Sequence, residues 1–165
     1  MRRVLRNLYF SYSQCFVFDE SEEQHGCEWT DEHVNQGFVR REKVLAFGTI
    51  LQFGTARLTV SFDPIADLGG AGRSIRCPLY LPSGKLVVMG PEETMYETAP
   101  VVLVEPGWYF VTCSQWVDDN EEVDMNINFA KDKGAGPQQS AVLIADRGLN
   151  VPKNLREDGA PVELL

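Results

Sequence analysis

Few residues in this sequence have the chemistry of a catalytic or metal-binding group. Only two histidines, His25 and His33, could act as a general base or a metal ligand. No Gly-x-Ser-x-Gly turn occurs, and neither histidine has a nucleophile in a strained turn nearby, so Ser-His-Asp and Cys-His catalysis are not indicated. Together with Cys15 and Cys27 the histidines match no structural-zinc spacing. The sequence therefore predicts no catalytic residue, no metal site and no cofactor.

Carboxylates are abundant and gather in two clusters, one at residues 19–23 and one at residues 118–124. The second cluster lacks the alternating ligands and the central glycine of an EF-hand loop. A metal-dependent hydrolase built on these carboxylates is the enzymatic alternative, although the supply of histidine is poor. Trp116 beside the second cluster is either a binding anchor or a core tryptophan. The predicted partner-binding residues are Glu20, Glu22, Glu23, Trp116, Asp118, Asp119, Glu121, Glu122 and Asp124.

The charge balance restricts the possible partners. There are 15 basic and 24 acidic residues, which give a formal net charge of −9. Direct binding to DNA, RNA or an anionic membrane is disfavoured, because contact with phosphate needs a positive surface. A partner recognised by its charge should be basic, whereas the alternative explanation of the acidity is solubility alone.

The acidic cluster at residues 118–124 lies between strongly patterned segments. Residues 101–104 are continuously apolar, residues 105–107 read Glu-Pro-Gly, and residues 108–113 are rich in aromatic and β-branched side chains, a pattern that predicts a β-hairpin. From residue 123 to 129 apolar and polar side chains alternate, which predicts a strand with one wet face. The acidic loop should therefore connect two core strands.

Similar patterns predict further elements along the chain. Alternation predicts strands over residues 8–18, 45–53, 56–62 and 75–81, and residues 81–85 resemble a hairpin turn. One short helix is predicted after Trp29, because Thr30 can cap it and Gly37 can end it.

These elements amount to about eight short strands and one helix. They predict an all-β fold, an antiparallel β-sandwich, with a partly open barrel as the alternative. Residues 1–130 should form one domain, and residues 131–165 a linker, an edge strand over 141–144 and a mobile tail. The start of the chain lacks the apolar core of a secretory signal, so we expect a cytoplasmic protein.

Four segments of the sequence, in a fixed order, share mostly aromatic and turn residues. They contain Leu8, Phe10, Ser11, Tyr12, Gln14, Phe16 and Phe18; Trp29, Thr30, Asp31, Glu32, Gly37 and Phe38; Phe47, Gly48 and Thr49; and Pro106, Gly107, Tyr109, Thr112 and Cys113. This ordered set resembles the competence protein J (ComJ) family. That family is the inhibitor of a bacterial nuclease associated with DNA uptake, and it has relatives that look like immunity proteins for toxin nucleases. The resemblance implies a small protein that binds a cognate nuclease, encoded nearby, and that has no active site of its own.

The resemblance and the charge together predict how such an inhibitor would work. Acidic loops around residues 20–23 and 118–124 would occupy the basic cleft in which the nuclease holds its substrate. The alternative from another class is a carbohydrate- or peptide-binding β-sandwich, which would use exposed aromatic side chains such as Trp29, Trp108 or Trp116.

Overall fold

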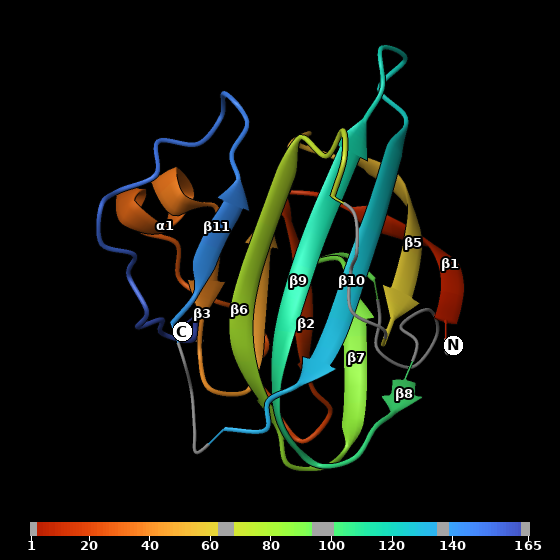
Figure 1. Ribbon diagram of the computed structural model, residues 1–165, viewed down its shortest axis with the longest axis vertical. Helices are drawn as coiled ribbons and strands as arrows, with labels where there is room; N and C mark the ends of the chain where they lie inside the picture. The colour runs from red at the N-terminus through yellow and green to blue at the C-terminus, as the bar shows by residue number, and fades with distance from the viewer. Residues whose placement is uncertain (1–2, 63–67, 94–100, 135–138, 163–165) are drawn as a thin grey trace.

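The computed structural model describes residues 3–62, 68–93, 101–134 and 139–162, and it consists of two β-sheets packed face to face (Figure 1). The six strands of sheet A are, in spatial order, β1 (Arg3–Phe10), β5 (Gly54–Ser61), β10 (Val123–Lys131), β9 (Gly107–Val117), β6 (Arg73–Leu81) and β11 (Ala141–Ile144). The five strands of sheet B are β3 (Phe38–Arg40), β4 (Val44–Gly48), β2 (Gln14–Asp19), β7 (Lys85–Met89) and β8 (Val101–Leu103). The predicted all-β sandwich is confirmed.

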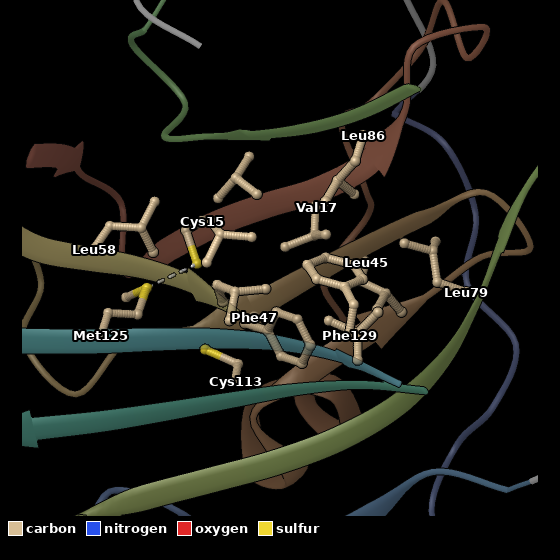
Figure 2. Close-up of a cluster of buried hydrophobic side chains, with 14 of the residues drawn as sticks. Cys15, Val17, Leu45, Phe47, Leu58, Leu79, Leu86, Cys113, Met125 and Phe129 are labelled. Carbon is tan, nitrogen blue, oxygen red and sulfur yellow. Dashed lines mark hydrogen bonds between the residues drawn. The ribbon is translucent and has the colours of Figure 1, made fainter. Parts of the chain in front are cut away.

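Alternating side chains build the core between the sheets. Along β9 the odd-numbered residues Tyr109, Val111 and Cys113 are buried, and side chains from sheet B meet them from the other side. Figure 2 shows this layer, in which Phe47 of β4 lies beside Phe129 of β10 and the thiol of Cys15 contacts the sulfur of Met125. Among the strands of the described residues, all pairs are antiparallel except β5 and β10, which run parallel.

Two predicted hairpins are wrong. The turn at residues 82–84 connects β6 in sheet A to β7 in sheet B, and residues 104–106 connect β8 in sheet B to β9 in sheet A. Neither pair of strands exchanges hydrogen bonds, because each turn carries the chain across the sandwich. Turn residues allow a reversal of direction, but they do not specify whether the returning strand joins the same sheet.

The predicted strand over residues 8–18 is also wrong as a single element. It consists of β1 in sheet A and β2 in sheet B, separated by a tight turn at Tyr12 and Ser13. The predicted strand over residues 45–53 likewise ends at Gly48.

The acidic loop and the short helix agree with the prediction. Strands β9 and β10 are antiparallel neighbours, and residues 118–122 connect them. Helix α1 (Asp31–Gln36) begins after Thr30, whose side chain accepts a hydrogen bond from the His33 backbone, and it ends at Gly37, which is in the left-handed conformation with φ 88°.

The C-terminal residues pass around α1, as the blue segment in Figure 1 shows. Strand β11 extends the edge of sheet A on β6, and the side chain of Gln36 exchanges two hydrogen bonds with the backbone of Arg156. Glu157 forms an ion pair with Arg40 at 2.7 Å.

The division into a domain over 1–130 and a linker with a mobile tail over 131–165 stays a prediction. Within the described ranges, no helix is long and apolar enough to span a lipid bilayer.

Candidate functional site

The two acidic clusters lie at opposite ends of the sandwich. We call the end with the turn between β9 and β10 the hairpin end, at the top of Figure 1. We call the other end the loop end, because β2 finishes there and residues 20–26 follow it. The register of β9 places the two clusters at opposite ends. Gln115, near the hairpin end, is opposite Arg73 of β6. Gly107, at the other end of β9, is opposite Leu81, which lies close to the start of β7, and the end of β2 pairs with that part of β7. The 11 residues of β9 span about 35 Å at ~3.3 Å per residue.

At the loop end most of the acidic side chains have partners. Glu22 lies 3.7 Å from Arg41 and 3.8 Å from Lys43, and Glu20 lies 4.0 Å from Lys85. Such partly exposed pairs contribute little to stability, but they neutralise the local charge. This end therefore presents a weaker negative field than its sequence suggests.

At the hairpin end the carboxylates are exposed. One Asp118 carboxylate oxygen accepts hydrogen bonds from the backbone N–H groups of Asn120 and Glu122, both at 2.9 Å, and so fixes the turn. Among the described residues, the side chains of Asp119 and Glu121 have no hydrogen-bond or ion-pair partner. The tip of the hairpin thus combines a defined backbone with free negative charge.

Trp116 lies at the base of this hairpin on the outer face of sheet A. It is directly opposite Asp124, which in turn is opposite Arg57 on β5. Arg57 donates to both oxygens of Asp124, at 2.7 and 2.9 Å, and these contacts raise the pKa of Arg57. The three side chains line a shallow groove, so Trp116 is half-buried surface rather than core.

The three tryptophans of the alternative binding module do not share one surface. Trp108 stacks on Tyr80 with ring centroids 5.1 Å apart, near the start of β9, whereas Trp116 is eight positions further along the same strand. Trp29 precedes α1 and donates a hydrogen bond to Gln14 of sheet B. A ligand bound to one surface would therefore contact only one of these rings.

A pocket at the hairpin end was not predicted from the sequence. It has a volume of about 420 Å³, and Tyr12, Trp29, Val34, Ile50 and Leu149 give it apolar walls. Arg73 also lines it, with a side chain only 6% exposed that donates to Asp146 at 2.6 Å and to the Gly48 carbonyl at 2.9 Å. Because Arg73 already has these partners, the pocket is mainly an apolar cavity and not an anion site.

The turn at the mouth of this pocket is strained. Tyr12 and Ser13 have φ angles of 53° and 56°, the left-handed geometry of a type I′ turn, for which Asn-Gly is preferred. For other residues this conformation costs about 1–2 kcal/mol each. Hydrogen bonds from Ser13 to the Gln52 carbonyl at 2.8 Å and from Thr49 to the Ser13 carbonyl at 2.9 Å hold the turn in place.

Residue type alone gave no signal for this pocket, since Tyr-Ser does not indicate a left-handed turn. The segments that carry the family resemblance do meet there. From three of the four segments, Tyr12, Trp29, Gly37, Gly48 and Thr49 all line the pocket.

The four cysteine thiols and His33 are buried, and His25 is half-buried. Burial raises the pKa of the Cys27 thiol to about 11 and that of Cys77 to about 12, which disfavours the reactive thiolate. Burial also lowers the pKa of both His25 and His33. The described part of the chain contains no group of three or more His, Cys, Asp or Glu side chains that could hold a metal ion.

Comparisons with known proteins identify the family. Among solved structures, ComJ from Bacillus subtilis, an inhibitor of the DNA-degrading activity of NucA, is similar, with a TM-score of 0.66 at 15% identity over 80% of this chain and 96% of that one. A second structure, of crocagin biosynthetic gene J, is similar with a TM-score of 0.54 at 16% identity, over 81% of this chain and 100% of that one. No curated protein sequence matches. Residues 7–131 match the sequence model of competence protein J, so this chain belongs to the ComJ family.

Proposed function

We propose that this protein is an inhibitor that binds a nuclease, and that it has no catalytic activity of its own. Membership of the ComJ family carries the proposal, because a member with the same fold, ComJ of Bacillus subtilis, inhibits the DNA-degrading activity of NucA. The net charge of −9 supports it, since a nuclease that holds nucleic acid presents a basic cleft to which an acidic protein is attracted.

The hairpin end is the surface that we assign to this contact. Asp118, Asp119, Glu121 and Glu122 lie on one short turn and project beyond the body of the sandwich (Figure 1). A narrow, negatively charged projection can enter a cleft that is shaped for a phosphate backbone. Glu20, Glu22 and Glu23 are at the loop end and cannot enter the same cleft, so we leave them out of the interface.

The inhibition test uses the nuclease encoded beside the gene for this chain. Its cleavage of DNA and of RNA is measured with and without a saturating concentration of the protein. We expect cleavage of one of the two substrates to be suppressed. A nuclease from an unrelated source is the control, because its activity should not change. Unchanged cleavage of both substrates by the neighbouring nuclease would overturn the proposal.

A further inference from the structure

The apolar pocket at the hairpin end has features that the acidic hairpin does not explain. Its volume of about 420 Å³ is within the range of about 300–1,000 Å³ that is typical of binding pockets. Tyr12 at its mouth is 71% exposed and Val34 on α1 is 55% exposed. Phe53, on the segment that accepts the hydrogen bond from Ser13, is 66% exposed. Large apolar side chains exposed together around a pocket are typical of an interaction site.

The strain at Tyr12 points to the same site. This tyrosine is held in a backbone conformation that suits asparagine or glycine, and its ring is directed away from the core. The ring therefore contributes little to folding, while its backbone opposes folding. Strain of this kind is concentrated at sites that bind ligands, and tyrosine is among the residues that most often anchor a protein interface.

The pocket and the acidic hairpin are connected. The backbone N–H of Ile50, in the pocket wall, donates to the side chain of Gln115 at 3.0 Å, and Gln115 precedes the last residue of β9 by two positions. The three residue steps from Gln115 to Asp118 span about 10 Å in an extended strand. One partner molecule can therefore contact both features at once.

We propose that this pocket receives one apolar side chain of the inhibited nuclease, flanked by basic residues that face the acidic hairpin. The inference rests on the proposed function, because the occupant is the nuclease itself. Charge complementarity selects this occupant. An apolar pocket beside exposed carboxylates is complementary to a surface on which basic residues surround an apolar side chain. The hairpin should govern the rate of association, and the pocket the rate of dissociation.

Two substitutions of exposed apolar side chains test the pocket. Tyr12→Asn removes the ring and introduces a residue that suits the left-handed turn, so the variant should be at least as stable as the original protein. We expect dissociation from the neighbouring nuclease to become at least tenfold faster. Leu103→Asn is the control, since it removes an apolar side chain of similar exposure, 61%, on β8 at the loop end, away from the pocket, and its dissociation rate should not change. Chemical denaturation verifies that both variants are folded.

Val34→Lys is a second variant that does not depend on the turn. Val34 is on the exposed surface of α1, so the substitution leaves the core intact, but it places a positive charge at the mouth of the pocket. It should also accelerate dissociation about tenfold. If the original protein inhibits the nuclease and both Tyr12→Asn and Val34→Lys dissociate at the original rate, the pocket proposal is overturned and the inhibitor function stands. If the original protein does not inhibit, both proposals are overturned.

Discussion

The hairpin end and the loop end are both rich in carboxylates, yet these side chains differ in their burial and in their partners. At the loop end Asp19 is fully buried, and Glu20 and Glu22 lie beside basic side chains of neighbouring segments. At the hairpin end Asp119 and Glu121 are exposed on a turn that Asp118 holds in shape. Most carboxylates of the loop end therefore have partners, whereas Asp119 and Glu121 remain available at the hairpin end, where Glu122 and Asp124 lie beside Arg57. The formal net charge does not distinguish the carboxylates of the two ends.

The largest expected effect is on stability at the loop end. Asp19 accepts hydrogen bonds from the backbone of Ser21 at 2.9 Å and from the backbone and hydroxyl of Ser83 at 3.1 and 2.9 Å. Asp19→Ala leaves these donors without their charged acceptor, and such bonds contribute about 1.5–3 kcal/mol. We expect the free energy of unfolding, measured by denaturant titration, to fall by about 3 kcal/mol.

Asp119→Ala is the matched substitution at the hairpin end. Because the Asp119 side chain is exposed and has no partner among the described residues, its removal should change the free energy of unfolding by less than about 0.5 kcal/mol. Equal losses of stability in the two variants would show that the difference between the ends is not real.

The next effect concerns association with the nuclease. Replacement of Asp119, Glu121 and Glu122 by lysine reverses the field around the hairpin and leaves Asp118 to hold the turn. Electrostatic steering changes association rates by factors of about 10–1,000, so we expect the association rate at low salt to fall at least tenfold. The difference should shrink as added salt screens the charges. Surface plasmon resonance or stopped-flow fluorescence would measure it.

The control for this variant is lysine at Glu20, Glu22 and Glu23, which changes the net charge by the same amount at the loop end. Its association rate should fall much less. If the association rates of both variants fall by the same factor, the overall charge of the molecule drives association and the hairpin has no special role. If only the loop-end variant is slow, the interface lies at that end.

A smaller effect should appear when the pH is lowered. Burial lowers the pKa of His25 in the loop that follows β2, and of His33 in α1, below the ordinary value. Each histidine is therefore protonated more readily in the unfolded chain than in the folded one, so stability decreases as the pH falls below about 6.5. NMR titration of the two imidazole rings would locate the change, and a midpoint at or above the ordinary value for either ring would contradict its lowered pKa.

Much of this fold could be predicted from the sequence, because alternation specifies the faces of a strand. Strands β5, β6 and β10, and helix α1 with Thr30 and Gly37 at its ends, follow directly from the pattern. What could not be predicted is which sheet a strand joins. The turns at 82–84 and 104–106 contain ordinary turn residues, and only the packing of the two sheets decides that the chain crosses between them.

The candidate site was harder to predict for a related reason. The sequence shows two acidic clusters, but the register of β9 against β6 separates them, and no local pattern contains that information. The pocket is assembled from residues that are far apart in the chain, from Tyr12 to Leu149. Its strained turn also has residues that propensity would not select, which is expected where function opposes local preference.

A local change at the start of α1 tests whether the wall of the pocket can be destabilised without affecting the loop end. Thr30 accepts a hydrogen bond from the His33 backbone at 3.4 Å, and its own N–H donates to the His33 ring at 3.1 Å. Thr30→Ala removes the side-chain acceptor and should cost about 1 kcal/mol of stability, whereas Thr30→Ser retains a hydroxyl and should cost much less.

Since Val34 of α1 and Gly37 line the pocket, hydrogen exchange in Thr30→Ala should accelerate in α1 and remain unchanged in residues 20–26. Faster exchange at both ends would mean that the two ends unfold as one unit, so that a change in binding could not be assigned to the pocket alone.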